Sequence, residues 1–380
     1  MYSPRVLPSI ASTNNADNER SATSTAATND DMDLDPVYQE TSKQYISLHE
    51  AGKGTCGKVT FCIRTPSSTA NAPTTNPTAQ SPAIVAIKIP SREMCRDRIA
   101  VEITALRRIH STLAVSTNRN VARHLPTFIG ADPIEDGGSR WLSVHPIPGF
   151  NLERLRVVVT HIVSSSSGAS ATRTLPFPAI PEVLLLHIAK QLTKAVEWLH
   201  NVANISHNDV FGGNVMLDMS ASNKESGFIM PTVVLIDFDR ATLHPNDREK
   251  GIDRSFEYEL IHLLDGTGRA SSRETDSLKE DTIVPEGLMT WWDVFTRFLA
   301  INKSQYLQEA SSSSAQFRER FGVAIDRRLE DIADEEERQV QELLDMVVKK
   351  EVRFPSEERI RDALGQWEDG QVLVVVQKTR

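Results

Sequence analysis

The chain contains the stretch ISHNDVFGGN at positions 205–214 and, a little later, the stretch VLIDFD at positions 234–239. Asp209 and Asn214 are five residues apart, and Asp237 follows an apolar run that is typical of a buried strand. Carboxylate and amide oxygens are the ligands that Mg²⁺ prefers, and a carboxylate can also orient a hydroxyl group for reaction. The pattern therefore predicts that Asn214 and Asp237 bind a metal ion and that Asp209 acts as an acid–base group beside it.

A glycine-rich segment, AGKGTCGKV at positions 51–59, matches the pattern G-x-G-x-x-G-x-V through Gly52, Gly54, Gly57 and Val59. Glycines let the backbone approach phosphate oxygens closely, and the valine can cover an adenine ring. The same string also occurs at phosphate turns between a strand and a helix. Here β-rich sequence flanks it on both sides, which favours a hairpin. Taken alone, the segment fits an ordinary glycine turn equally well.

A lysine and a glutamate form a second candidate pair. The run VAIK ends in Lys88, and a lysine at the end of such a strand can bind the α- and β-phosphates of a nucleotide. Glu102 follows 14 residues later, three positions after Ile99 and four before Leu106, so it shares their buried stripe. A buried carboxylate needs a cation, and Lys88 is the natural partner. The alternatives are a solvent-exposed Lys88 and a Glu102 that reaches water at the edge of the stripe.

The order of these motifs indicates phosphoryl transfer. A glycine segment, a strand-end lysine, an aspartate–asparagine loop and a strand ending in aspartate follow one another as in enzymes that use ATP and Mg²⁺. We therefore expect ATP and Mg²⁺ as cofactors, and expect Asp209 to orient the acceptor hydroxyl. The alternative makes Asp209 a turn residue. His207 is expected to be structural, with a hydrogen bond to nearby backbone.

Composition and charge narrow the classes of function. The chain has 380 residues and a formal net charge of −9, which argues against nonspecific nucleic-acid binding. Its three cysteines are too few for a disulfide framework or a zinc site. No run approaches the roughly 18 apolar residues that span a bilayer, and the N-terminus has no apolar signal segment. We expect an intracellular protein, cytoplasmic or nuclear, with no membrane insertion and no nucleic-acid partner; the oligomeric state is left open.

The spacing of apolar residues changes along the chain. Short segments rich in β-branched residues predict strands at 45–50, 59–64, 84–89 and 141–145. Segments with helical spacing predict helices at 91–110 and 181–201, and the pattern after Asp239 is mostly helical. Residues 1–43 are rich in Ser, Thr and Asn and poor in large apolar groups, so we expect them to be disordered. A strand-rich part followed by a helix-rich part predicts an α+β fold.

Together, the motifs resemble those of the protein kinase-like superfamily, and their order is similar to that of a eukaryotic protein kinase domain. Divergent fungal kinase-like proteins with an I-D-F-D motif look most similar. Other segments also look like family elements: the helix before the catalytic loop (192–200), the gatekeeper (Val144), the hinge (145–149), the start of the helix that anchors the catalytic loop (253–256) and the final R-x-P-S-x-E segment (353–358). The resemblance covers about residues 44–368.

The resemblance implies a bilobal kinase-like fold. A small antiparallel β N-lobe with one regulatory helix would span about 44–145, a larger and mainly α-helical C-lobe would span about 146–368, and a tail would follow at 369–380. ATP would bind between the lobes, with its phosphates between the glycine segment and Lys88. Its adenine would lie near three apolar residues, Val59, Ala86 and Val144. The implied reaction transfers the γ-phosphate of Mg·ATP to a Ser or Thr hydroxyl of a protein substrate.

Three positions depart from the family pattern. Asn208 replaces the arginine before the catalytic aspartate, Phe211 replaces the lysine or arginine two residues after it, and Asp239 replaces the glycine of D-F-G. No A-P-E motif follows, and Asp253 comes only 14 positions after Asp239. Two alternatives therefore stay open: a small-molecule kinase similar to choline, ethanolamine or aminoglycoside kinases, and a nucleotide-binding pseudokinase scaffold. The intact V-A-I-K motif and the spacing of Glu102 favour the protein kinase branch.

Overall fold

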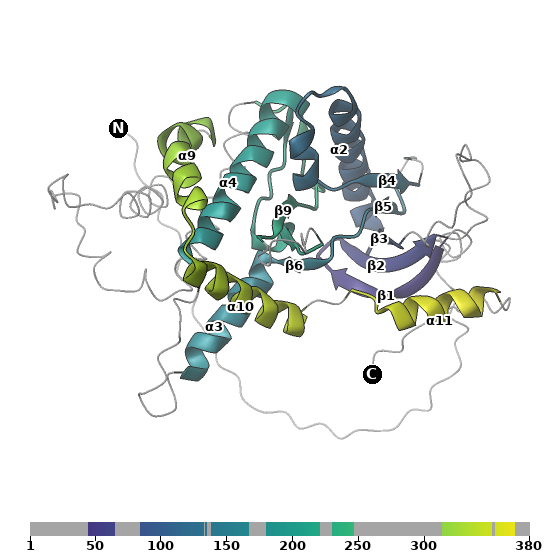
Figure 1. Cartoon of the computed structure of the whole chain (residues 1–380). Coiled ribbons are helices and arrows are strands. Elements are labelled where there is room, and N and C mark those ends of the chain that lie inside the picture. The colour runs from purple at the N-terminus through teal and green to yellow at the C-terminus, as the bar shows by residue number, and fades with distance from the viewer. Residues whose placement is uncertain are drawn as a thin grey trace, which may run out of the picture.

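The computed structural model describes residues 45–64, 84–132, 134, 138–166, 180–220, 230–246, 314–351 and 354–368. In these ranges the chain combines antiparallel sheets with several helices (Figure 1). The predicted α+β class is confirmed at this level. Three predicted regions lie outside the described residues: the N-terminal segment 1–43, the C-terminal tail 369–380 and the segment 253–256.

A five-stranded antiparallel sheet forms the first described part, with the strand order β1–β2–β3–β5–β4. The strands are β1 (Tyr45–Lys53), β2 (Gly57–Arg64), β3 (Ile84–Pro90), β4 (Phe128–Ala131) and β5 (Leu142–Val144). Both faces of β2 and β3 carry buried apolar side chains, which β-branched residues on a pleated surface supply well. The four predicted strands are confirmed, as is the hairpin at the glycine segment; β4 was not predicted.

Helix α2 (Arg96–Val115) packs on β3 and β4. Its buried stripe contains residues at helical spacing: Ile99, Glu102, Ile103, Leu106 and Ile109. The predicted helix began at Ser91, but a 3₁₀ turn, η2 (Glu93–Cys95), precedes α2. The Ser91 N–H donates a hydrogen bond to the carbonyl oxygen of Cys56 in the glycine hairpin, at 3.1 Å. Arg92, directly before η2, is extended with φ −150° and ψ 156°, so the helical conformation starts only after it.

Helix α4 (Glu182–Trp198) forms the centre of the helical part, because most of its residues are buried on all sides. The helices around it are α3 (Leu152–Ser166), α9 (Ser314–Glu330) and α10 (Asp334–Glu351), as Figure 1 shows. α4 continues into a π turn, η4 (Leu199–Ala203), which ends at Asn204 in the left-handed conformation with φ 56°. The helix predicted at 181–201 is confirmed, and α9 and α10 agree with the mostly helical pattern predicted after Asp239.

Two small antiparallel sheets hold the loops that follow α4. One consists of β6 (Gly149–Asn151), β8 (Val215–Asp218) and β9 (Thr232–Leu235), and the other of β7 (Ile205–Ser206) and β10 (Thr242–Leu243). Two 3₁₀ turns accompany them, η3 (Arg119–His124) and η5 (Gly212–Asn214). The Ile236 N–H also donates to the carbonyl oxygen of Asn214 at 2.8 Å. The sheets therefore bring the two most informative stretches of the sequence side by side.

The last described helix, α11 (Glu357–Glu368), returns to the five-stranded sheet and lies along β1 (Figure 1). The Phe354 ring packs edge-on against Phe61, with 5.3 Å between ring centroids. Arg359 donates a hydrogen bond to the carbonyl oxygen of Leu48 at 2.7 Å. The predicted lobe boundaries stay a prediction, although this helix, which falls inside the predicted second lobe, packs on the sheet of the first.

Within the described ranges, no helix combines the length and the hydrophobicity required to cross a bilayer.

Candidate active site

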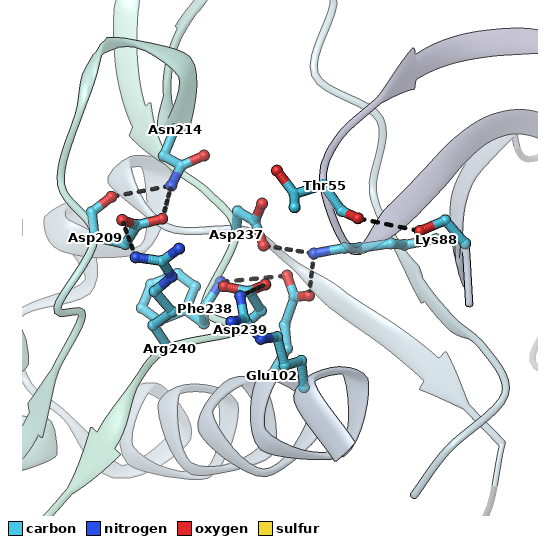
Figure 2. Close-up of polar contacts among 11 residues, drawn as sticks. Thr55, Lys88, Glu102, Asp209, Asn214, Asp237, Phe238, Asp239 and Arg240 are labelled. Atoms are coloured by element: carbon cyan, nitrogen blue, oxygen red, sulfur yellow. Dashed lines mark hydrogen bonds and ion pairs between the residues drawn. The ribbon is translucent and has the colours of Figure 1, made fainter. Parts of the chain in front are cut away.

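Lys88, Glu102 and Asp237 form a largely buried ion-pair network (Figure 2). The Nζ atom of Lys88 lies 2.6 Å from Oε2 of Glu102 and 2.5 Å from Oδ1 of Asp237. Only 12% of the Lys88 side chain is exposed. Burial lowers the pKa of Lys88, but the two carboxylates outweigh burial and raise the pKa above its usual value. Lys88 is therefore a permanent cation, and its predicted pairing with Glu102 is confirmed.

The β3 register and a glycine position Lys88. In the sheet, Lys88 lies between Val59 of β2 and Leu142 of β5. A Cβ atom added at Gly57 would come within 2.9 Å of the Lys88 Cε atom, so the lysine stem lies directly on the glycine backbone. Gly57, the third glycine of the predicted motif, is therefore needed for packing, because a larger residue there would displace the Lys88 side chain.

Glu102 connects helix α2 with both partners of the network. Its Oε2 atom accepts a hydrogen bond from Lys88, and its Oε1 atom accepts one from the Phe238 N–H at 3.3 Å. Burial raises the pKa of Glu102, and the charge of Lys88 opposes this rise. The side chain lies on the stripe of Ile99 and Leu106, as the sequence predicted. The position of α2 is therefore coupled to the lysine and to the segment after β9.

Asp237 has an unusual backbone conformation, with φ 66°. Non-glycine residues in this region are uncommon and often occur at functional sites. Figure 2 shows the Asp237 carboxylate pointing toward Lys88. The next residue, Phe238, is fully buried, and its ring lies 4.5 Å from the His207 ring. The buried phenylalanine anchors the turn, while one third of the Asp237 side chain stays exposed.

Asp209 and Asn214 lie opposite this network. The Asn214 Nδ2 atom donates hydrogen bonds to the backbone oxygen of Asp209 at 2.9 Å and to its Oδ2 atom at 3.1 Å. His207 is fully buried, and its Nε2 atom lies 2.9 Å from the carbonyl oxygen of Ile236. Its Nδ1 atom accepts a hydrogen bond from the Asp209 N–H at 3.3 Å. His207 is thus structural, as predicted, because it fixes the backbone on which Asp209 is placed.

Arg240 is a site residue that the sequence analysis missed. Its Nη1 atom lies 3.3 Å from Oδ1 of Asp209 (Figure 2). Asn208 supports it, since the Asn208 Nδ2 atom donates to the carbonyl oxygen of Arg240 at 3.0 Å and to Oγ1 of Thr242 at 2.8 Å. The only signal in the sequence is a cation directly after the Asp-Phe-Asp run, and no spacing rule distinguishes it from a surface arginine.

Asp239, two residues after Asp237, is largely buried. Its Oδ2 atom lies 3.5 Å from Nη1 of Arg98 on α2. Burial and the nearby Asp237 raise the pKa of Asp239, while Lys88 and Arg98 oppose this rise. The residue forms a second ion pair between α2 and the segment after β9.

The predicted adenine-contacting residues share one apolar surface. Val59, Ala86 and Val144 pack against the same buried cluster on one face of the sheet, and Ala86 is the direct neighbour of Val144 across β3 and β5. The Gly54 N–H donates to the carbonyl oxygen of Gly57 at 2.8 Å and closes the hairpin turn. A Cβ at Gly52 would meet nothing within 4 Å, so no neighbour in the structure requires a glycine there.

Asn214 and Asp237 carry side-chain oxygen atoms of the kind that Mg²⁺ prefers. They offer an amide and a carboxylate oxygen, and Figure 2 shows the amide oxygen of Asn214 directed toward the side on which Asp237 lies. Mg²⁺ is usually held by one or two protein carboxylates together with water and substrate phosphates. Within the described ranges, no group of three or more His, Cys, Asp or Glu side chains is suited to a metal ion. The two residues fit Mg²⁺ that is shared with a phosphate ligand.

Comparison with known proteins adds no identification. No protein-family model matches the chain, and no curated protein sequence matches it. The chemical interpretation of the site therefore depends on its geometry: a buried lysine cation, two side chains that offer oxygen atoms, and a carboxylate that pairs with an arginine.

Proposed function

We propose that this chain is an ATP- and Mg²⁺-dependent phosphotransferase with a two-lobed, kinase-like fold. In this proposal it transfers the γ-phosphate to a Ser or Thr hydroxyl of a protein substrate. One observation carries the proposal, namely the convergence of five polar side chains from separate elements on one site: Lys88, Glu102, Asp209, Asn214 and Asp237 (Figure 2). The sheet with α2 would be the smaller lobe, and the part built around α4 the larger.

The Lys88 end of the site would bind the nucleotide. A permanent cation held between two carboxylates is suited to the α- and β-phosphates, because its position is fixed before the ligand arrives. The adenine would lie against the apolar surface of Val59, Ala86 and Val144. Asn214 and Asp237 would hold Mg²⁺, which when bound neutralises charge on the phosphate oxygens.

The Asp209 end would orient the acceptor hydroxyl for the transfer. In the transfer step, the acceptor oxygen forms a bond to the γ-phosphorus while the bond from that phosphorus to the β–γ bridging oxygen breaks, and ADP leaves. Asp209 orients the hydroxyl and accepts its proton. Asn214 donates a hydrogen bond to Asp209 Oδ2, which restrains the carboxylate in one orientation. The reaction then depends on positioning and charge stabilisation, with no covalent enzyme intermediate.

A small-molecule kinase is the second candidate, and Phe211 favours it. This aromatic residue stands two positions after Asp209 and is 41% exposed. An exposed aromatic ring this close in sequence to the proposed catalytic carboxylate can bind a quaternary ammonium group of a small acceptor.

A transfer assay with γ-labelled ATP tests both candidates. The purified full chain is incubated with Mg²⁺ and either generic Ser/Thr protein substrates or choline, ethanolamine and an aminoglycoside. Label in protein supports the proposal, whereas label only in a small molecule favours the second candidate. The matched control is Asp209→Asn, which keeps the size of the side chain and removes the base. Stabilisation by ATP without any transfer would contradict the proposal and indicate a nucleotide-binding scaffold.

A further inference from the structure

Arg240 occupies a position that the proposed reaction does not yet explain. Its guanidinium contacts Asp209 Oδ1, whereas Oδ2 of the same carboxylate accepts the hydrogen bond from Asn214. The Arg240 side chain is 51% exposed and the Asp209 side chain is 23% exposed, so both can be reached from solvent. An exposed ion pair of this kind contributes little to stability. We therefore look for the role of the Arg240–Asp209 pair in the reaction at Asp209 and not in the stability of the fold.

The backbone of Arg240 is held in place by Asn208. The Asn208 side chain donates to the carbonyl oxygen of Arg240 and to Oγ1 of Thr242, and its Oδ1 atom accepts from Oγ of Ser206 at 3.0 Å. Asn208 itself adopts φ 61°, a region that asparagine enters more readily than most residues. Pairing of Thr242 with Ser206 across β10 and β7 adds a further restraint. The Cα of Arg240 is therefore fixed relative to Asp209, while its long side chain can exchange partners.

No cation comes from the catalytic loop two positions after Asp209, because Phe211 stands there. Its ring lies over Gly213, where an added Cβ would come within 2.5 Å of the ring. The charge of a transferring phosphoryl group is spread over its three equatorial oxygens, and cations near these oxygens stabilise the transition state. Phe211 cannot supply this charge. Arg240 can, because its guanidinium already pairs with Asp209, the carboxylate that is proposed to face the acceptor.

We propose that Arg240 is a catalytic residue that binds the transferring γ-phosphoryl group and supplies the positive charge that Phe211 lacks. This inference rests on the proposed phosphotransfer function. In the resting site the guanidinium pairs with Asp209. When nucleotide and acceptor are bound, it turns to the γ-phosphate oxygens, and Asp209 Oδ1 becomes free to accept the hydroxyl proton. A guanidinium suits this exchange because it stays charged and presents several donors in one plane.

Steady-state phosphotransfer kinetics of Arg240→Ala and Arg240→Gln test the proposal. We expect kcat to fall on the order of 100-fold, as for loss of one preorganised donor to a transition-state oxyanion. The KM for ATP should change less than the kcat, because the contact forms mainly during transfer. Arg240→Lys keeps the charge and should recover part of kcat. The double variant Phe211→Lys with Arg240→Ala should also recover part of it, since the cation then comes from position 211.

Arg338→Ala is the matched control. Arg338 lies on α10 and pairs with two carboxylates, those of Glu335 and Glu342. Its side chain is 50% exposed, close to the 51% of Arg240. Its loss should leave kcat unchanged. Thermal unfolding of all variants separates catalysis from folding, and Arg240→Gln, which keeps most of the side-chain stem, covers the case in which Arg240→Ala is unstable.

The outcomes are distinct. An unchanged or increased kcat in the Arg240 variants, with an active wild type, would overturn the role of Arg240 and leave the proposed function intact. An increased kcat would identify the Arg240–Asp209 contact as inhibitory. Failure of Phe211→Lys and of Arg240→Lys to recover any activity would also overturn the inference. A wild type without phosphotransfer to any acceptor would overturn both the inference and the proposed function.

Discussion

The two ends of the polar site differ in burial and in how their partners are held. At one end, Lys88 is 12% exposed and pairs with carboxylates 14 and 149 positions away in the sequence. At the other end, Asp209 and Arg240 are more exposed and are held by short loops through hydrogen bonds to backbone. The buried end therefore depends on the whole fold, whereas the exposed end depends on two adjacent loops. Substitutions at the buried end should lower both stability and turnover. Substitutions at the exposed end should lower turnover alone.

Lys88→Met should have the largest effect, because it removes a cation that two carboxylates share. Breaking a buried ion pair costs roughly 3 kcal/mol, since the remaining charge is left unpaired. We expect a lower unfolding temperature, loss of stabilisation by Mg·ATP and loss of phosphotransfer. The double variant Lys88→Met with Glu102→Gln should regain part of the stability and none of the nucleotide binding. Thermal unfolding with and without Mg·ATP measures both. Wild-type stability and binding in Lys88→Met would refute the description of the buried end.

Asp209→Ala should reduce turnover to a small residual rate and leave the fold intact. Loss of a positioned acid–base group lowers the rate about 10²- to 10⁴-fold. The variant should still bind Mg·ATP, because Lys88 and Asp237 are unchanged. Calorimetric titration with the nucleotide and the transfer assay together separate binding from transfer. Equal phosphotransfer activity in the wild type and in Asp209→Ala would show that Asp209 has no role in the reaction.

The buried histidines of the helical part should make the stability depend on pH, and they lie outside both ends of the site. Burial lowers the pKa of His124 and of His187 to about 4, and each is hydrogen-bonded to a backbone carbonyl of the segment at β9. Below pH 6.5 these two histidines bind protons in the unfolded chain but stay neutral in the folded chain. Their contribution to stability is therefore lost progressively from about pH 6.5 to about pH 4. Each unit of pKa difference corresponds to about 1.4 kcal/mol.

The free energy of unfolding, measured from pH 7.5 to 4, tests this expectation. His187→Gln should have a flatter profile than the wild type. His110→Gln, at an exposed position on α2, serves as the matched control and should keep the wild-type slope. Parallel profiles for His187→Gln and the wild type would exclude His187 as a source of the acid sensitivity.

The smallest effect is expected at α11, which adds to the sheet that carries Lys88. Arg359→Ala removes the hydrogen bond to the Leu48 carbonyl and should lower stability by about 1 kcal/mol. Arg361→Ala, exposed on the same helix, should change it by less than half of that. Urea denaturation of the two variants gives the comparison. Equal stability of both variants would mean that the contact of α11 with β1 does not support the sheet.

The Lys88 end could be predicted from the sequence because its signals are periodic. Short segments rich in β-branched residues identified β1 to β3. The helical spacing of Glu102 with Ile99 and Leu106 placed the carboxylate on the buried stripe. Because a buried Glu102 carboxylate needs a cation as its partner, Lys88 could be predicted to pair with it. The 3₁₀ turn before α2 was not predicted, because the extended Arg92 and the short turn after it leave no signal in the spacing of apolar residues.

The Asp209 end could be predicted only in part. The aspartate–asparagine spacing identified Asp209 and Asn214, because a short loop brings side chains at that separation together. The Arg240 contact and the bonds of Asn208 depend on the pairing of β7 with β10, two very short strands that no propensity identifies. The return of α11 to β1 was missed for a similar reason, since an amphipathic helix does not indicate which apolar surface it will cover.

A structure of the full chain with Mg²⁺ and a non-hydrolysable ATP analogue tests the central claim most directly. We expect the phosphates beside Lys88 and the glycine hairpin, the adenine against Val59, Ala86 and Val144, and a metal ion bound by Asn214 and Asp237. A nucleotide bound elsewhere on the protein, or no binding at millimolar analogue, would contradict the account.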